Sequence, residues 1–452
     1  MQIEITREYI DYLKGVIESG QTQELKEPLS EMHPADIADI LEVLSMDEAK
    51  EIYLLLEGDM ASDVLLEIPE DDRRRFLAEL PSDIIARQYI EYMDTDDAAD
   101  VIGELPDNKR EEVIAFIDDQ EHAGEITELL SYDEDSAGGI MAAELVAVNE
   151  NWNVQKCLKE IGRQSEDIDE IYYVYVVDND NKLKGVLSLK KLIQYPTQTN
   201  ISNIYQKDVI SSLIDADREE VAQKMEKYDL VALPVVDYSG HLKGRITIDD
   251  VVDIIREEAE KDYQMVSGIT GDVEPSDTVF YITKARLPWL LIGLVGGILG
   301  AFVISGNEKA LEHVPNMAYF IPLIGAMAGN VGVQSSSIVV QSIASGANDL
   351  QSMSRKLFKE LGVALIVAFV LAGLILIFNL SFDIGGSGSS LAFTVSTSLF
   401  IVVIFASLFG TFIPLFLDKL KIDPALATGP FITTMNDIMG LLIYMLIGQF
   451  MF

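Results

Sequence analysis

Five long apolar segments near the C-terminal end limit what this chain can fold into. They lie near residues 287–304, 317–343, 360–380, 391–417 and 425–450. A helix needs about 20 consecutive, mostly apolar residues to cross the hydrocarbon core of a bilayer. The sequence therefore predicts a membrane protein in which residues 284–452 form a transmembrane domain with five helices.

The net negative charge of the chain lies entirely in the part that precedes these segments. The net charge is −41, yet residues 284–452 carry eight basic and eight acidic residues. The whole negative charge therefore lies on residues 1–283, which are expected to be water-soluble. Such a surface repels nucleic acid and attracts cations. An acidic surface that serves only solubility would have the same composition.

The positions of the basic residues predict how the chain crosses the membrane. Apart from Lys309, the basic residues of the transmembrane part precede the first segment or lie in the second and fourth loops. By the positive-inside rule, the N-terminal domains are cytosolic, and five crossings put the C-terminus outside. Cys157 is the only cysteine, which excludes an intrachain disulfide and suits the cytosol. The start, MQIEITREYI, has no apolar h-region, so no signal peptide is expected.

Residues 1–136 have the pattern of a helical repeat, with apolar residues spaced by three and four. Three similar units recur, each with an aspartate before a branched residue: Ala38-Asp39-Ile40, Ser62-Asp63-Val64 and Ala99-Asp100-Val101. We expect stacked helical hairpins that form a solenoid. We interpret the repeated aspartate as a helix N-cap rather than a ligand. The acidic cluster Asp94, Asp96, Asp97 and Asp100 would gain from a divalent ion, although a solvated helix start fits equally well.

A second repeat follows, with an offset of 59 residues. Val176-Val177-Asp178 returns as Val235-Val236-Asp237, and each copy reads strand, turn, strand, helix. This region resembles a tandem pair of CBS domains, here 137–200 and 201–262. The ribose-binding pattern of that family matches Gly244, Thr247 and Asp250, whereas the first copy has Gly185 and Ser188 but Lys191 in place of the aspartate. The resemblance implies one adenine-nucleotide (ATP) site, and a structural pair without nucleotide is the alternative.

An acidic helix is expected to connect this pair to the membrane part, over residues 250–283. Its carboxylates Asp250, Asp253, Glu257 and Glu258 are three or four residues apart, so several share one face. Like charges at this spacing destabilise a helix unless a cation is shared between them. A solvated acidic helix is the alternative. The helix would then approach the membrane through Glu274-Pro275.

The last apolar segment contains the candidate ion site. Asp437 is the only charged residue between Ala425 and Phe452. A carboxylate inside a membrane is costly unless it faces water, a partner or an ion. Gly429-Pro430 loosens the helix before it, and oxygens suited to a hard cation come from Thr433, Thr434 and Asn436. An aspartate that only bonds to a neighbouring helix is the alternative.

The second apolar segment supplies further polar residues. Asn330 and Gln334 are four residues apart and share one helical face, within a run of small residues. A small-residue packing seam with interhelical hydrogen bonds would give the same pattern. Five helices with one aspartate make a thin wall for a pore, so we expect the pore on the axis of a dimer.

Taken together, these motifs resemble the MgtE family of magnesium channels over nearly the whole length of the chain. The most specific matches are Arg286-Leu-Pro-Trp289, Gly329-Asn-x-Gly-x-Gln334-Ser, and Asp423-Pro-Ala-Leu with Gly429-Pro430, Asp437 and Gly440. The resemblance implies a homodimer whose pore lies between the second and fifth helices. It implies that Asp437 meets hydrated Mg²⁺, and that cytosolic Mg²⁺ is held at positions that match Asp217, Glu219, Asp229, Asp250, Asp253, Glu258 and Asp262. Two positions depart from the family, Gln341 in place of an arginine and Lys261 in place of an acidic ligand.

The predicted function is therefore a Mg²⁺-selective, Mg²⁺-gated channel that imports magnesium. Two alternatives are a membrane-anchored sensor of Mg²⁺ or nucleotide, and a CBS-regulated transporter of another solute, including another divalent cation. No enzyme is expected, because the four histidines, His33, His122, His241 and His313, are scattered and no nucleophile is paired with a base.

Overall fold

The computed structural model describes residues 6–20, 22–165, 168, 171–271, 273, 277–344, 353–382, 388–427 and 429–452. The chain divides into two compact units, residues 1–254 and 255–452, and each is described by itself. The predicted passage through Glu274-Pro275 lies outside the described residues.

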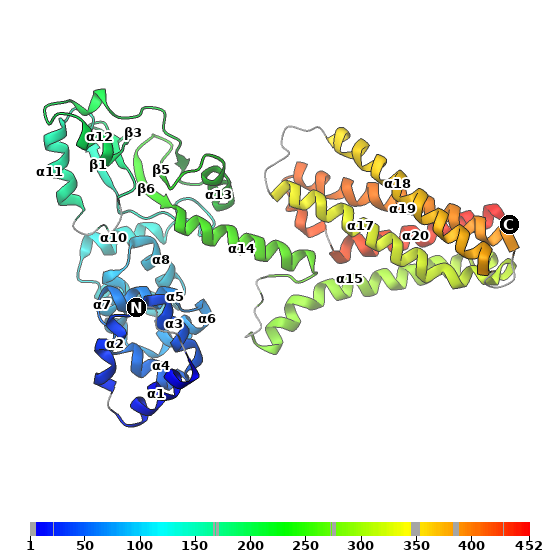
Figure 1. The fold of residues 1–452 in the computed structure, drawn as a ribbon, viewed down its shortest axis with the longest axis horizontal. Coiled ribbons are helices and arrows are strands. Elements are labelled where there is room, and N and C mark those ends of the chain that lie inside the picture. The colour runs from blue at the N-terminus through cyan, green and yellow to red at the C-terminus, as the bar shows by residue number, and fades with distance from the viewer. Residues whose placement is uncertain are drawn as a thin grey trace. The chain divides into compact units, whose positions relative to one another are not determined.

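The N-terminal part of the first unit is an all-helical array, as the repeat predicts (Figure 1). Alternate helices pack on one another, α3 on α5, α7 on α9 and α8 on α10, so each hairpin buries the apolar face of its neighbours. Tyr53, Phe76 and Tyr89 form an aromatic cluster in its core. Its helices are α1 (Arg7–Glu18), α2 (Lys26–Ser30), α3 (Pro34–Val43), α4 (Met46–Tyr53), α5 (Asp59–Glu67), α6 (Glu70–Glu79), α7 (Ser82–Gln88), α8 (Thr95–Gly103), α9 (Asp107–Phe116) and α10 (Gln120–Leu129).

The interpretation of the repeated aspartates as N-caps is wrong. Asp39, Asp63 and Asp100 lie inside α3, α5 and α8. The caps come from other polar residues: the Ser45 side chain accepts from Glu48 N, and the Asp119 carboxylate accepts from Glu121 N. In each unit the branched residue after the aspartate belongs to the buried face of a helix that begins several residues earlier. The aspartate is therefore inside the helix and cannot cap its N-terminus.

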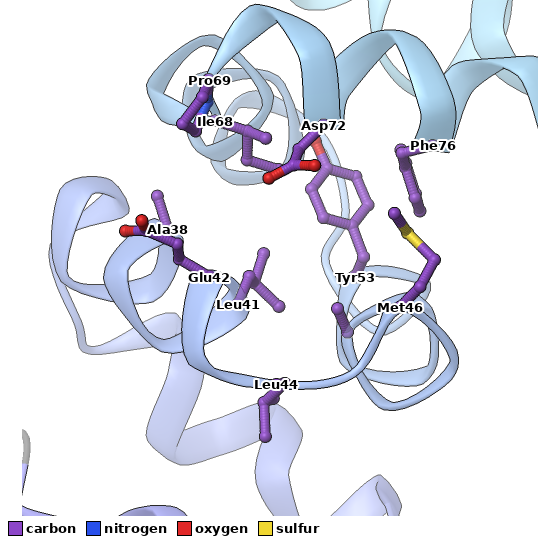
Figure 2. Close-up of a pocket in the computed structure, with 11 residues that line it drawn as sticks. Ala38, Leu41, Glu42, Leu44, Met46, Tyr53, Ile68, Pro69, Asp72 and Phe76 are labelled. Atoms are coloured by element: carbon purple, nitrogen blue, oxygen red, sulfur yellow. The ribbon is translucent and has the colours of Figure 1, made fainter. Parts of the chain in front are cut away.

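A pocket of about 240 Å³ lies in this array between α3, α4 and α6. Figure 2 shows Leu41, Tyr53 and Phe76 around it, with the carboxylates of Glu42 and Asp72 also at the pocket. Its lining is mostly apolar, and it adjoins the aromatic cluster, so we interpret it as an imperfection in the packing of successive hairpins.

The two CBS copies have the same strand pairing, which confirms the 59-residue repeat. In the first, β1 (Val146–Asn149) runs parallel to β2 (Val174–Val177), which pairs antiparallel with β3 (Leu183–Leu187). In the second, β4 (Ser212–Leu213), β5 (Ala232–Val236) and β6 (Leu242–Thr247) repeat that order. The register is also repeated, since Val176 pairs with Gly185 and Val235 with Gly244. The helices are α11 (Val154–Gln164), α12 (Leu189–Gln194) and α13 (Arg218–Lys227).

The predicted acidic helix is α14 (Ile248–Val266), which begins directly after β6. Among the described residues of the second unit, five helices are long and apolar enough to cross a membrane. They are α15 (Val279–Gly306), α17 (Ile321–Ala344), α18 (Met353–Phe382), α19 (Gly388–Lys419) and α20 (Gly429–Met451), with the short α16 (Glu308–His313) between α15 and α17. Each predicted segment lies on one of these five, together with the 3-10 turns that precede α17 and α20.

Helices α17, α19 and α20 form the core of the membrane part, and α15 and α18 pack on its outside (Figure 1). Close approach of α17 and α19 depends on glycine, because a Cβ on Gly410 would lie 2.3 Å from the carbonyl oxygen of Gly332. This packing fixes which face of α17 meets α20, and it therefore positions the candidate ion site.

Candidate functional site

Asp437 lies on α20 and its carboxylate faces two glycines of α17. A Cβ added to Gly329 would stand 3.1 Å from Asp437 Oδ1, and one added to Gly325 would stand 4.0 Å away. Larger side chains at these positions would fill the space that the carboxylate occupies. Oδ1 is buried and has no hydrogen-bond partner within the described part of the chain. A buried carboxylate oxygen without a partner is suited to an ion or to the water around one.

The other predicted pore residues do not all point the same way. Asn330 and Gln334 are exposed on α17 in the single chain. Asn436 is fully buried and packs against Gly332, where an added Cβ would be 1.8 Å from its Nδ2. The structure therefore places Asn436 between α17 and α20, whereas Asn330 and Gln334 lie on a face open to another molecule.

Thr433 and Gly429 belong to the first turns of α20. The Thr433 hydroxyl donates to the carbonyl oxygen of Gly429 at 2.9 Å, and its methyl group faces Gly329. Thr434 points elsewhere, since its methyl group would meet a Cβ on Gly296 of α15. Of the polar residues around Asp437, Thr433 is the one that shares its glycine-lined face.

The end of α14 packs on the start of α20. A Cβ on Gly268 would lie 2.6 Å from Pro430 Cγ, and Met265, Val340 and Ala425 form a small buried cluster beside it. Burial raises the pKa of Asp262, and the nearby charge of Asp423 raises it further. The last turn of the acidic helix is therefore held against the helix that carries Asp437.

The acidic cluster of α8 gathers carboxylates from three separate stretches of the chain. Oxygens of Asp94, Asp96 and Glu144 lie within 4.8 Å of one another. Burial raises the pKa of Asp97 to about 7, and the charge of Asp250 at the start of α14 raises it as well. Desolvation and the charge of Glu134 raise the pKa of Asp100, also to about 7. Carboxylates crowded in this way repel one another unless a cation is present.

Glu144 was not identified from the sequence. It lies in the segment before β1, and its carboxylate accepts hydrogen bonds from Thr95 N at 3.0 Å and Thr95 Oγ1 at 2.8 Å. A lone glutamate in a connecting segment has no periodic pattern that could have indicated this position. The cluster also has a cationic neighbour, since Arg245 Nη2 lies 3.6 Å from Asp94 Oδ2.

The remaining predicted metal ligands lie apart from that cluster. Among the described residues, groups of three ligand atoms within 4.8 Å form only around Glu144. Asp217 caps α13 by accepting from Glu219 N at 2.9 Å, and Asp229 is exposed with φ of 50°. On α14, Asp253 and Glu257 are exposed, and Glu258 pairs with Lys261 at 3.3 Å.

The predicted nucleotide residues have structural partners of their own. Thr247 Oγ1 donates to Asp250 Oδ2 at 2.6 Å, and Thr247 N donates to the same oxygen at 3.2 Å. A Cβ on Gly244 would lie 2.6 Å from the carbonyl oxygen of Ala142, so the close approach of a neighbouring backbone segment explains that glycine. The same approach occurs in the first copy, where a Cβ on Gly185 would lie 2.2 Å from the carbonyl oxygen of Gln206.

A second carboxylate inside the membrane part was also missed. Glu360 on α18 accepts a hydrogen bond from Ser335 of α17 at 2.7 Å and another from Ser407 of α19. It therefore joins three helices, through serine side chains of the kind that often form hydrogen bonds between membrane helices.

Comparison with known proteins agrees with this architecture. A family model described as a divalent cation transporter matches residues 321–447. The model of the MgtE intracellular N domain matches residues 32–135, and the CBS domain model matches 137–197 and 201–257. Together these matches cover most of the chain.

Two curated relatives are similar over nearly their full length. Magnesium transporter MgtE of Thermus thermophilus is 34% identical over 446 residues, which cover 97% of each chain. Magnesium transporter MgtE of Bacillus subtilis is 31% identical over 429 residues, 95% of this chain and 94% of that protein.

Two solved structures resemble the soluble part. One is the soluble part of a magnesium transporter, with 33% identity and a TM-score of 0.50 over 56% of this chain and 98% of that one. The other is the cytosolic domain of the Mg²⁺ channel MgtE in complex with ATP, with 34% identity and a TM-score of 0.51 over 54% of this chain and 99% of that one.

Proposed function

Because this chain belongs to the MgtE family of magnesium transporters, we propose that it is a Mg²⁺-selective channel that imports magnesium across the cytoplasmic membrane and closes when cytosolic Mg²⁺ is high. As a member of that family it is a transporter and not an enzyme. We propose in addition that it conducts Mg²⁺ as a channel, that cytosolic Mg²⁺ closes it, and that it is a homodimer.

The observation that carries the pore assignment is the unpartnered Oδ1 of Asp437 opposite Gly325 and Gly329. Mg²⁺ gives up its water reluctantly, so a carboxylate in a glycine-lined space would meet the ion through its hydration shell. A single negative charge in an otherwise apolar helix favours a cation and disfavours an anion.

A homodimer would complete this site. Asn330 and Gln334 are exposed polar residues on a helix that is otherwise apolar enough to span the membrane. Amide side chains facing lipid would lack hydrogen-bond partners. A second copy that faces them across a two-fold axis would place two Asp437 carboxylates and these amides around one path.

The cytosolic acidic cluster would act as the sensor. Its donor set is entirely oxygen, which suits Mg²⁺, and it includes Asp94, Asp97, Asp100 and Asp250. Bound Mg²⁺ would neutralise the mutual repulsion of these carboxylates. Asp217, Glu219, Asp229, Asp253, Glu257, Glu258 and Asp262 are proposed as further contributors, on the resemblance alone.

The packing of α14 on α20 supplies the coupling to the pore. A shift in the acidic helix would reach Gly429 and Pro430 through Val266 and Gly268, about two helical turns before Asp437. Compaction of the acidic domains at high Mg²⁺ would then hold the end of α14 against the start of the helix that carries the ion site. This arrangement requires the N-terminal domains to be cytosolic, and five crossings then leave the C-terminus outside.

ATP binding at the second CBS copy is a separate proposal. It is supported by the relative whose cytosolic domain was crystallised with ATP. In this chain Asp250 would have to serve both the nucleotide and the acidic cluster. Its carboxylate accepts a hydrogen bond from Thr247, and its charge raises the pKa of Asp97. Nucleotide and divalent cation would therefore influence each other at this residue.

Mg²⁺ uptake into proteoliposomes tests the proposal, with wild type compared with Asp437→Asn and with Asp418→Asn. The first variant removes the charge and keeps the shape, and the second is a matched control at an exposed carboxylate near the end of α19. We expect Asp437→Asn to lose at least about tenfold in flux, because a bond to a charged group is worth about 1.5–3 kcal/mol. Unchanged flux in that variant would refute the pore assignment and move the ion site elsewhere, whereas a wild type without Mg²⁺ flux would favour a membrane-anchored sensor.

A further inference from the structure

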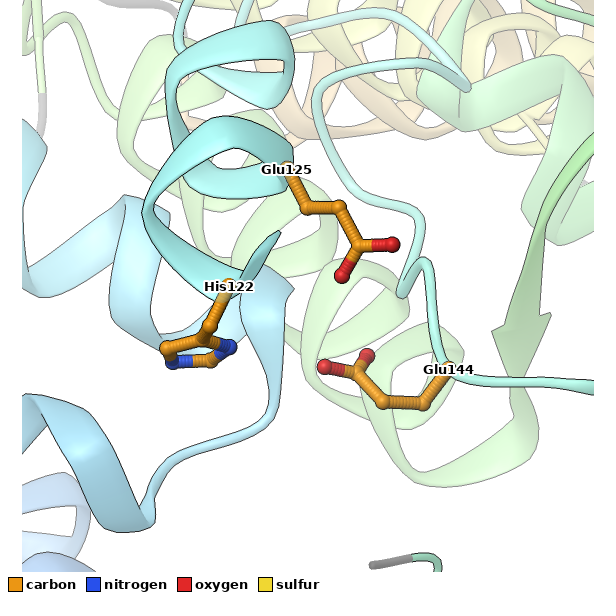
Figure 3. A group of neighbouring side chains, drawn as sticks. All are labelled: His122, Glu125 and Glu144. Carbon is orange, nitrogen blue, oxygen red and sulfur yellow. The ribbon is translucent and has the colours of Figure 1, made fainter. Parts of the chain in front are cut away.

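Three side chains outside the proposed pore and acidic sensor form a compact group. Ligand atoms of His122, Glu125 and Glu144 all lie within 4.8 Å of one another. His122 and Glu125 are one helical turn apart on α10, and Glu144 comes from the segment that precedes β1. Figure 3 shows both carboxylates and one ring nitrogen of His122 facing a common space. All three side chains are half-buried.

The histidine is oriented by a hydrogen bond outside the group. His122 Nε2 lies 3.1 Å from the carbonyl oxygen of Ile90. A carbonyl oxygen accepts only, so Nε2 must carry the proton and donate. In the neutral ring Nδ1 is then unprotonated and able to bind a metal. Histidines that bind metals usually donate their other N–H to a backbone carbonyl or a carboxylate in this way.

One of the two carboxylates is also held in position. Glu144 is fixed by the two hydrogen bonds that it accepts from Thr95, which leaves further lone pairs on both oxygens. Glu125 adds a second half-buried carboxylate, so the group contains two carboxylates with the Nδ1 atom of His122 beside them.

We propose that His122, Glu125 and Glu144 form a binding site for a d-block divalent cation of the Zn²⁺ type, distinct from the all-oxygen Mg²⁺ sites. One imidazole nitrogen and two carboxylates are ligands that Zn²⁺ accepts, with water able to complete four-coordination. Mg²⁺ prefers an all-oxygen environment and keeps most of its water. Donor atoms around tetrahedral Zn²⁺ are roughly 3.4 Å apart, so no two of these ligand atoms would have to approach by more than about 1.4 Å.

The proposed Zn²⁺ site does not depend on the proposed transport function. Its effect on Mg²⁺ sensing rests on that function. Glu144 belongs both to this group and to the group with Asp94 and Asp96. A d-block cation that engages Glu144 would withdraw one carboxylate from the proposed Mg²⁺ sensor. It would also tie α10 to the segment that leads into the first CBS copy.

Equilibrium dialysis of the full-length protein in detergent tests the site, with Zn²⁺ as the probe in a large excess of Mg²⁺ that occupies the oxygen sites. We expect the wild type to retain Zn²⁺ under these conditions. His122→Gln and Glu125→Gln should each weaken Zn²⁺ binding at least about tenfold, since even outer partners of a metal site contribute that much. Melting temperature without Zn²⁺ verifies that each variant is folded.

Two matched controls separate the site from general charge effects. Glu121→Gln removes an exposed carboxylate from the same helix, and His33→Asn removes another imidazole while keeping a side chain that caps α3. Both should bind Zn²⁺ as the wild type does. X-ray absorption at the zinc edge should show an imidazole ligand in the wild type that is lost in His122→Gln.

Three results would overturn the proposal. One is complete displacement of Zn²⁺ by Mg²⁺, another is equal Zn²⁺ binding by wild type and His122→Gln, and the third is a zinc edge spectrum of the wild type without imidazole. If both glutamine variants failed to fold, the wild-type spectrum and the displacement measurement would still decide. Loss of Mg²⁺ flux in the pore variant concerns a different residue, so failure of either proposal can be told from failure of the other.

Discussion

Gly429, the first residue of α20, lies directly against the backbone of Val266, the last residue of α14. A Cβ on Gly429 would stand 2.3 Å from the carbonyl oxygen of Val266, and Gly429 has φ of 48°. Both the space and the backbone conformation therefore require glycine. This contact joins the acidic helix to the helix that carries Asp437.

Gly429→Ala should weaken the control of flux by Mg²⁺. The methyl group would push α14 from α20, and the left-handed backbone would cost about 1 kcal/mol more. We expect the half-inhibiting Mg²⁺ concentration to rise about tenfold, within the usual range of coupling between sites. Uptake at graded Mg²⁺ on the cytosolic side measures it. Gly297→Ala, where an added Cβ meets nothing within 4 Å, is the control. Equal inhibition of both variants would show that this contact does not carry the coupling.

Lys261→Glu should make the protein more sensitive to Mg²⁺. Lys261 lies 3.3 Å from Glu258 on α14, where it offsets part of the negative charge. Replacing it with a carboxylate adds repulsion that a divalent cation can relieve. We expect half-inhibition at about two- to fivefold lower Mg²⁺, since an exposed charge pair is worth about 0.2–1 kcal/mol. Lys190→Glu, on the exposed face of α12, makes the same charge change elsewhere. A shift to higher Mg²⁺ would contradict the sensing role of α14.

The stability of the Mg²⁺-free protein should fall as pH rises from about 4 to 7. The pKa of Asp97 is raised from 3.8 to about 7 in the folded chain. Well below pH 4 Asp97 is protonated in both the folded and the unfolded chain, so it does not change the free energy of unfolding. Between these values the unfolded state loses its proton first, so unfolding becomes more favourable, and above pH 7 the full cost applies.

Asp97→Asn isolates this effect. At pH 7.5 without Mg²⁺ we expect a melting temperature about 2–4 °C above wild type for each kcal/mol recovered, and a flatter pH profile. With saturating Mg²⁺ the order should reverse, because the variant lacks a ligand. Asp107→Asn, another aspartate in the first turn of a helix, is the control. A variant that follows the wild-type pH profile would exclude Asp97 as the titrating group.

Glu360→Ala should destabilise the membrane part, whereas Glu360→Gln should be tolerated. Alanine removes the shared acceptor of the buried hydroxyls of Ser335 and Ser407, which lie 3.1 Å apart and can satisfy only one of their two donors with each other. A buried polar group that loses its partner costs about 1–3 kcal/mol. Glutamine keeps an acceptor oxygen in place. Thermal unfolding in detergent compares the two variants, and equal melting temperatures would show that the three-helix junction is not held by this carboxylate.

Most of the fold could be predicted because it is encoded in periodic patterns. Hydropathy indicates the five membrane helices, and the 59-residue offset indicates two CBS copies whose register indeed repeats at Gly185 and Gly244. Helix caps were harder to predict, since Asp39 and Asp63 have cap-like neighbours but lie inside helices.

The sites were predictable only where a single residue is conspicuous. Asp437 stands alone among apolar residues, so its sequence context marks it. Glu144 and Glu360 could not be identified in this way, because their hydrogen-bond partners are far away in sequence. Glu144 contacts Thr95, and Glu360 contacts Ser335 and Ser407. The direction of Asn436 also depends on packing, because adjacent residues on a helix point about 100° apart.

The buried amide of Asn436 adds a cost to the close packing of helices α17 and α20. Neither its nitrogen nor its oxygen has a hydrogen-bond partner among the described residues, and Gly332 leaves no room for a third group between them. Such an amide costs about 1–3 kcal/mol while it stays dry. Any separation of α17 from α20 that admits a water molecule recovers part of that cost. The close packing of α17 on α20 therefore carries a cost at Asn436 that the apolar contacts around it must offset, and a hydrated opening at this position would be correspondingly easier.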